Sequence, residues 1–151
     1  MNAIAVPAAA EPALVTRLVE KDGATRLDEE GFAAFVAAPG EAVLFLTEDP
    51  ARFREVNDLA VILPEIRSAA SRPFRIGVLP PPLANAKAST WGVRRWPALV
   101  FLRGGAWLGN IEGLREWAEY LSLANALLEA EPRALPAKTI PVAVAGASPC
   151  A

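Results

Sequence analysis

The residues that most often carry out chemistry in proteins are scarce in this sequence. It contains no histidine, the commonest general base and metal ligand, and a single cysteine, Cys150, next to its last residue. A disulfide, a CxxC redox pair and a zinc site each need at least two such residues, so these kinds of site are excluded. Acidic pairs remain at Glu48–Asp49 and at Glu55 and Asp58. Paired carboxylates can hydrolyse bonds, but we expect these four on an exposed surface rather than facing one another in a deep pocket.

The composition is that of one globular domain. The chain has 151 residues, of which 53% are hydrophobic and 21% charged. Its net charge of −2 argues against a general nucleic-acid binder, and no apolar run approaches the ~20 residues that span a bilayer. The first ten residues lack the positive charge of a secretory signal. We therefore expect residues 1–11 to form a flexible arm, and the protein to be cytoplasmic.

Apolar patterning predicts strands that alternate with helices. Continuous apolar runs at 42–46 and 74–79 indicate strands covered on both faces. Strands at 98–102 and 106–111, separated by two glycines, indicate a hairpin. The remaining expected elements are a strand at 24–27 and helices at 12–21, from Asp28 to Pro39, from near Pro50 to Ile66, at 83–90 and at 114–130. This order predicts an α/β fold with parallel pairing and one antiparallel edge.

Two further expectations concern the core and the C-terminal segment. Phe32, Phe35 and Val36 are expected to be buried, and so are the last helix's Leu114, Trp117, Leu121 and Leu128, together with Trp107. The run Pro80–Pro82 is expected to separate a strand from a helix. The proline-rich residues 131–151 are expected to form a mobile tail, although the apolar stretch 140–144 could dock as a strand.

Residues 91–114, WGVRRWPALVFLRGGAWLGNIEGL, resemble the C-terminal half of a thioredoxin. In that fold a helix leads through a short loop to a cis-proline, a strand, a glycine turn, an edge strand and a last helix. The resemblance spans residues 23–130 and implies a thioredoxin-like fold, with a mixed central sheet flanked by helices and a cis peptide before Pro97. An X–Pro bond costs only about 0.5–1 kcal/mol to hold cis.

The redox half of a thioredoxin is missing. In thioredoxins the CxxC pair lies between the central strand and the following helix. Here that stretch reads TEDPARF, with Pro50 and Phe53 at the matching positions and Leu44 where thioredoxins carry a buried acid. Because dithiol chemistry depends on a thiolate at this place, oxidoreductase activity is excluded.

A narrower resemblance rests on TEDPARFREVNDLAVILPEI, GVRRWPALVFLR and GNIEG. Together these segments resemble the HyaE/HupG/HoxO family of [NiFe]-hydrogenase expression and formation proteins, over residues 12–130. The resemblance implies a non-catalytic chaperone that requires no metal or other cofactor. It also implies that the chain binds the small-subunit precursor of an uptake hydrogenase and its twin-arginine signal peptide, and delays export until assembly is complete.

The candidate binding residues lie where thioredoxins carry their active site. Trp96 precedes Pro97, and the backbone there could pair with an extended peptide while the indole supplies an apolar anchor. Trp96 could equally cover the gap left by the lost active-site loop. Glu48 and Asp49 could clamp the arginines of a signal peptide, or serve only as acids at a helix N-terminus.

The other candidates are charged residues around the same place. Glu55 and Asp58 could extend the acidic surface, or form only the solvated face of a helix. Arg94 and Arg95 could meet acidic groups on the small subunit or on a second accessory protein; a solvated loop, or local pairing with the acids at 48 and 49, is the more ordinary interpretation. Glu112 is a weaker candidate near the same place.

An alternative role is a scaffold. The chain would then bind another maturation factor, or shield the small subunit's iron–sulfur clusters, without reading the signal peptide.

Overall fold

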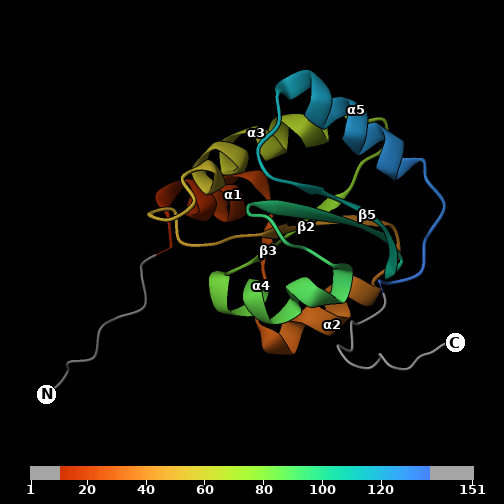
Figure 1. Ribbon diagram of the computed structural model, residues 1–151, viewed down its shortest axis with the longest axis horizontal. Coiled ribbons are helices and arrows are strands. Elements are labelled where there is room, and N and C mark those ends of the chain that lie inside the picture. Colours follow the sequence, from red (N-terminus) through yellow and green to blue (C-terminus); the bar gives the residue numbers. More distant parts are fainter. Residues whose placement is uncertain (1–10, 137–151) are drawn as a thin grey trace, which may run out of the picture.

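The chain folds around a five-stranded mixed sheet, described here by a computed structural model of residues 11–136. The spatial order is β1-β3-β2-β4-β5, in which β1, β3 and β2 are parallel and β4 and β5 run antiparallel to their neighbours (Figure 1). The strands are β1 (Thr25–Arg26), β2 (Glu41–Leu46), β3 (Arg75–Leu79), β4 (Ala98–Arg103) and β5 (Ala106–Glu112). The mixed sheet expected from the sequence is confirmed.

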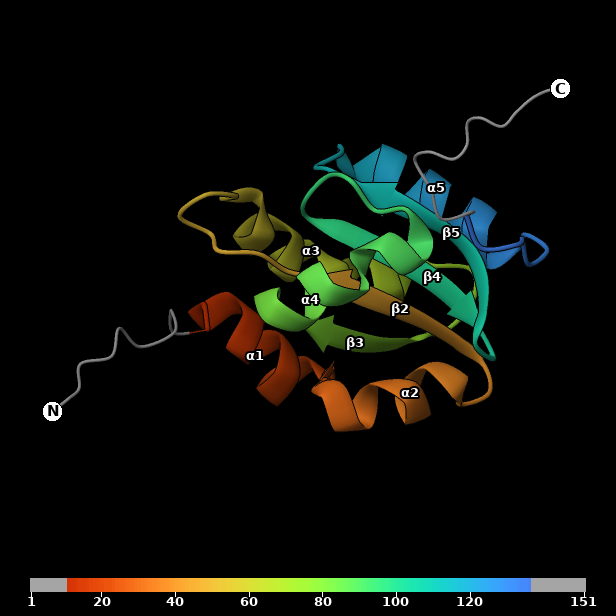
Figure 2. The same ribbon diagram turned by 60° about the horizontal axis from the view of Figure 1, so that its bottom comes forward.

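Helices cover both faces of the sheet. One layer contains α1, α3 and α5, and the opposite layer contains α2 and α4, which lies across the middle of the sheet (Figure 2). The helices are α1 (Ala13–Asp22), α2 (Glu29–Ala37), α3 (Glu55–Ala69), α4 (Pro81–Lys87), the 3₁₀ helix η1 (Ala88–Trp91) and α5 (Trp117–Leu128). Within residues 11–136, no helix combines the length and the apolar character needed to cross a bilayer.

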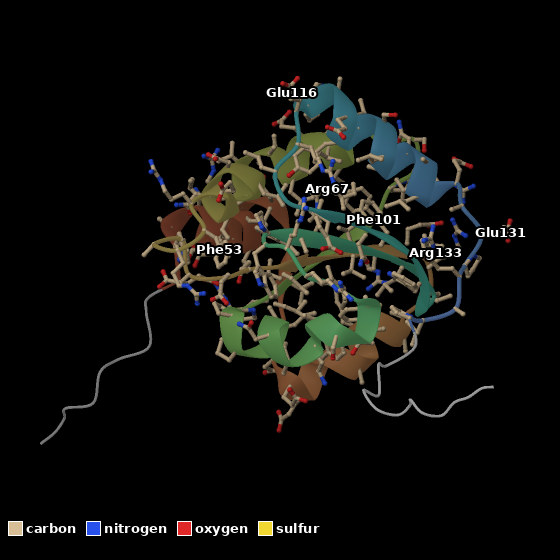
Figure 3. The ribbon with its side chains drawn as sticks, viewed as in Figure 1. Phe53, Arg67, Phe101, Glu116, Glu131 and Arg133 are labelled. Atoms are coloured by element: carbon tan, nitrogen blue, oxygen red, sulfur yellow. The ribbon has the colours of Figure 1, made fainter. Side chains whose placement is uncertain are left out.

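The central strand β2 contributes to two hydrophobic cores because successive side chains of a strand point to opposite faces. Val43 and Phe45 pack in the core beneath α1, α3 and α5, while Leu44 and Leu46 pack in the core beneath α2 and α4. Phe101 on β4 joins the first core (Figure 3). All of these side chains are fully buried, and burying one of this size stabilises a fold by roughly 1.5–3 kcal/mol.

Local sequence signals explain where several elements begin and end. Asp28 caps α2, as predicted, by accepting a hydrogen bond from the Gly31 N–H at 2.7 Å. Gly23 ends α1 in the left-handed conformation, with φ +80°. Pro81 is the first residue of α4, where its fixed φ suits a first helical turn. The proline run therefore starts a helix as well as ending a strand.

Three expectations about the helices are wrong. α3 begins at Glu55 rather than near Pro50, because residues 50–52 form a turn of their own. α5 begins at Trp117, and its buried stripe runs through Tyr120, Ala124 and Leu128, which leaves Leu114 and Trp117 exposed. The apolar side chains of α2 are only half-buried, because this helix packs against the edge of the second core.

The boundaries between the domain and the two predicted terminal segments differ from the expectation. Glu11 belongs to the domain, since its carboxylate accepts hydrogen bonds from Thr16 and Arg26. Residues 131–136 are not free of the domain, since the backbone N–H of Arg133, a residue labelled in Figure 3, donates to the Trp107 carbonyl on β5 at 2.8 Å. The expected strand at 140–144 and Cys150 lie outside the described residues.

An ion pair at the start of β2 ties the sheet to the end of α5. The Glu41 carboxylate accepts hydrogen bonds from Arg103 at 2.9 Å and from Arg72 at 3.3 Å. Arg103 also donates to the carbonyls of Leu128, at 2.6 Å, and Ala130, at 3.0 Å. Hydrogen bonding to Arg103 holds the pKa of the Glu41 carboxyl below its usual value of 4.5.

We predict that Glu41→Gln lowers the free energy of unfolding at pH 7 by about 1–2 kcal/mol, because the amide loses a charge-assisted hydrogen bond to Arg103. A carboxyl with a lowered pKa stabilises the fold above its unfolded-state pKa, and this contribution is lost as the pH falls through the folded-state pKa. The difference between the two proteins in urea unfolding should therefore be larger at pH 7 than at an acidic pH below the folded-state pKa of Glu41. A difference that is equally large at both pH values would contradict this assignment, and Glu20→Gln on the exposed face of α1 is the control.

Candidate functional site

Four loops meet at one end of the sheet because of the strand register. Leu46 at the end of β2 pairs with Leu79 at the end of β3 and with Ala98 at the start of β4, which in turn pairs with Glu112 at the end of β5. The loops that follow β2, β3 and β5 and the turn that precedes β4 therefore lie together. We call the surface formed by residues 47–58, 96–97 and 113–117 the rim.

Glu48 is a buried structural residue. Its side chain accepts hydrogen bonds from the Asn85 side-chain amide at 2.8 Å and from the Asp49 backbone N–H at 2.9 Å. The residue is only 8% exposed. These bonds tie the loop after β2 to α4, so the carboxylate that was expected to clamp an arginine is engaged inside the protein.

The other acids of the rim are more accessible. Asp49 is half-buried and holds the turn that follows it, accepting from the Ala51 N–H at 2.9 Å. Glu55 and Asp58 are exposed in the first turn of α3, where the helix dipole favours negative charge. Burial is the main cause that raises the pKa of Tyr120 on α5, and the negative charge of Asp58 adds to it.

The Trp96–Pro97 peptide is cis, as the sequence predicts. Pro97 is buried, and its carbonyl accepts a hydrogen bond from the Gly113 N–H at 2.8 Å. Trp96 is half-buried: part of its ring packs against the core beneath α4, and the rest reaches solvent. Among residues 11–136, neither the N–H nor the C=O of Trp96 has a backbone partner. Both roles weighed for this side chain therefore fit its position.

Glu112 fixes the loop that leads to Trp96. One of its oxygens, Oε1, accepts hydrogen bonds from the backbone N–H groups of Arg94 and Arg95, each at 3.0 Å. Both arginine side chains are exposed, and neither pairs with a carboxylate of the described residues. Their expected local pairing with Glu48 and Asp49 does not occur.

The apolar residues of the rim were missed by the sequence analysis. Leu114 is 46% exposed and Trp117 is 43% exposed, although both were expected in the core. Tyr120 donates its hydroxyl hydrogen to the Gly113 carbonyl at 3.0 Å, which fixes the loop that carries Leu114. The glycine at 113 was the available signal that the chain turns here and that the buried face of α5 starts later.

The rim is suited to binding rather than to catalysis by a thiol or by histidine. It carries neither residue, and its most buried carboxylate, Glu48, is engaged. Glu55 and Asp58 are exposed, and Asp49 lines a cavity of about 400 Å³ beside Glu48. No group of three or more potential metal-binding side chains is found in the part of the chain that the structure describes. Fold and site together define a thioredoxin-like domain without the dithiol of thioredoxins.

A solved structure has the same fold. A solved structure of a mutant thioredoxin from Halobacterium salinarum superposes with a TM-score of 0.52 at 17% sequence identity, covering 74% of this chain and 96% of the thioredoxin. This similarity supports the fold.

Sequence relationships identify the family. The model of the family described as Hydrogenase-1 expression protein HyaE matches residues 14–120. The hydrogenase expression/formation protein HoxO of Cupriavidus necator is 38% identical over 140 residues, which cover 91% of this chain and 87% of HoxO. HupG of Rhodobacter capsulatus is 34% identical over 119 residues, covering 78% of this chain and 86% of HupG. The chain belongs to the HyaE family of hydrogenase expression proteins.

We predict that Glu112→Ala frees the loop before Trp96 without unfolding the domain, because two backbone N–H groups lose their acceptor. Amide hydrogen exchange at residues 94 and 95 should become about tenfold faster or more, while amides of β2 keep their protection. Protection that is unchanged at both loop amides would show that Glu112 does not hold this loop.

Proposed function

We propose that this protein is a non-catalytic chaperone in the maturation of an uptake [NiFe] hydrogenase. It binds the small-subunit precursor through the rim, engages the twin-arginine signal peptide, and delays export until assembly is complete. Family membership supports a role in hydrogenase expression. Such a chaperone acts in the cytoplasm, before export.

The observation that carries the proposal is the combination of exposed carboxylates and exposed apolar side chains on one surface. Glu55 and Asp58 lie in the first turn of α3. Trp117 lies at the start of the neighbouring α5, and Leu114 lies in the loop just before it. A twin-arginine signal peptide joins arginines to an apolar stretch. Carboxylates bind guanidinium groups through paired hydrogen bonds, and an exposed tryptophan is an effective anchor for apolar side chains.

Trp96 supplies a third feature of the rim, beside its carboxylates and its exposed apolar side chains. Its backbone N–H and C=O have no backbone partner within residues 11–136, and they lie at the edge of the rim next to Pro97. An extended peptide can bind by pairing its main chain with such groups. The small area that this mode buries favours weak, reversible binding, which suits a precursor that must later be released.

The test is binding of the full-length chain to purified small-subunit precursor, with and without its signal sequence. We predict that Glu55→Lys/Asp58→Lys weakens binding roughly tenfold, because attraction to the arginines becomes repulsion. Trp117→Ala should cost more than about 1 kcal/mol of binding free energy. The matched control is Glu65→Lys, which changes charge on the exposed face of the same helix, farther from the rim.

The precursor without its signal sequence separates the two roles considered for this family member. A chaperone that reads the signal loses binding to the truncated precursor, whereas a scaffold for the mature subunit retains it. Retention of wild-type binding by both rim variants would show that the rim is not the binding surface.

A further inference from the structure

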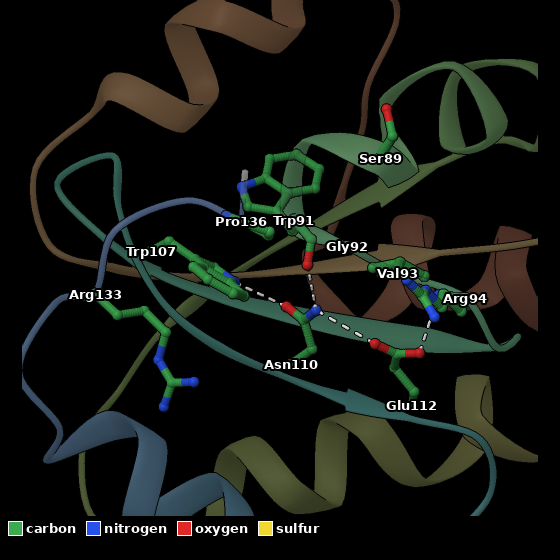
Figure 4. A pocket seen from close by; sticks show the side chains of 10 residues that line it. All are labelled: Ser89, Trp91, Gly92, Val93, Arg94, Trp107, Asn110, Glu112, Arg133 and Pro136. Carbon is green, nitrogen blue, oxygen red and sulfur yellow. Dashed lines mark hydrogen bonds between the residues drawn. The ribbon is translucent and has the colours of Figure 1, made fainter. Parts of the chain in front are cut away.

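A second surface of the molecule, next to the rim, is a groove along the edge strand β5. It is a cavity of about 750 Å³ with β5 as its floor, η1 and the loop after it on one side, and the segment after α5 on the other (Figure 4). A smaller cavity of about 260 Å³ adjoins it, since both are lined by Asn110 and Glu112. We call the two together the edge groove.

The floor of the edge groove is held by a hydrogen-bond network. The Asn110 side-chain oxygen accepts from the Trp107 indole N–H at 2.8 Å, and its amide donates to the Trp91 carbonyl at 2.8 Å (Figure 4). The same amide approaches Glu112 Oε2 at 3.4 Å, while Oε1 accepts from the backbone before Trp96. The one acid that lines the groove is thus already engaged by the protein.

The walls of the edge groove carry excess positive charge. Arg94 and Arg133 line the larger cavity, and Arg95 and Arg115 line the smaller one, against the single negative charge of Glu112. Among residues 11–136, only Arg115 of these four arginines has a carboxylate within 4 Å, and that surface pair with Glu119 is weak. The net charge of the whole chain is −2. The positive charge of the groove is therefore a local feature and not a property of the whole surface.

β5 is the edge strand of the sheet, and its outer edge can accept a backbone hydrogen bond: the Trp107 carbonyl accepts the backbone N–H of Arg133 at 2.8 Å. Such an edge can pair with the main chain of an extended polypeptide. Trp91, which is only 4% exposed, lines the cavity beside this strand.

We propose that the edge groove binds an extended, acidic polypeptide segment of a partner protein. Its carboxylates pair with the arginines, and its main chain pairs with β5. A polypeptide fits better than a nucleic acid, because β5 is an edge strand whose outer N–H and C=O groups, apart from the Trp107 carbonyl that Arg133 occupies, can pair with a peptide backbone. This surface extends beyond the rim, with which it shares Arg115, and the proposal does not depend on the proposed function.

The probe is a fluorescein-labelled peptide of alternating glutamate and valine residues, with an alternating lysine and valine peptide as its counterpart. Fluorescence anisotropy with the full-length protein should detect binding of the acidic peptide alone, and raising the salt concentration should weaken it. Indole N–H signals in an NMR titration should shift for Trp91 and remain in place for the exposed Trp117.

The deciding variant is Arg94→Glu/Arg95→Glu, since both side chains are exposed and only their backbone groups bind Glu112. We expect it to weaken binding of the acidic peptide roughly tenfold. Arg17→Glu/Lys21→Glu makes the same change of charge on the exposed face of α1 and should bind as the wild type does. Thermal unfolding of both variants checks that they are folded.

Three results would overturn the proposal. The first is equal binding of the acidic and the lysine peptides. The second is unchanged binding of the acidic peptide by the folded Arg94→Glu/Arg95→Glu variant. The third is tighter binding of single-stranded oligothymidine than of the acidic peptide. The last result would assign the groove to nucleic acid instead.

Discussion

The burial of β2 on both faces is the constraint on which the rest of the structure depends. Because its side chains alternate, Val43 and Phe45 tie one helical layer to the sheet while Leu44 and Leu46 tie the other. Shifting this strand by one residue would exchange the two sets, so its register is strongly specified. The same register brings the loops after β2, β3 and β5 to one end of the sheet. Placement of the rim thus follows from the packing of the core.

The fold could be predicted from the sequence because its signals are local. Apolar runs mark β2 and β3, a glycine pair marks the β4–β5 hairpin, and Asp28 marks the start of α2. The extent of α5 was harder to predict, since the apolar side chains of its first turn fit a helical pattern equally well whether they face the core or solvent. Only the position of the helix against β5 decides that Tyr120 is buried and Trp117 is exposed.

The candidate site was predicted less well because side-chain partners far apart in the sequence decide it. Glu48 was correctly placed at the rim, but its bond to Asn85, 37 residues away, could not be read from either local sequence. The role of Glu112 likewise depends on two backbone N–H groups, which carry no sequence signal. Carboxylates on the same surface can therefore have different roles. Glu48 is part of the framework, whereas Glu55 and Asp58 on α3 remain accessible to a partner.

The short segment after α5 has a consequence for how the protein behaves in a crowded solution. Open sheet edges invite pairing between copies of a chain, and proteins commonly guard them. Here Arg133 occupies the carbonyl of Trp107 and places its guanidinium 5.4 Å from the centre of the indole ring. This guard lies beyond residues 14–120, the part matched by the family model. The cover over this part of the β5 edge is thus supplied by a residue outside the part of the chain that the family model matches.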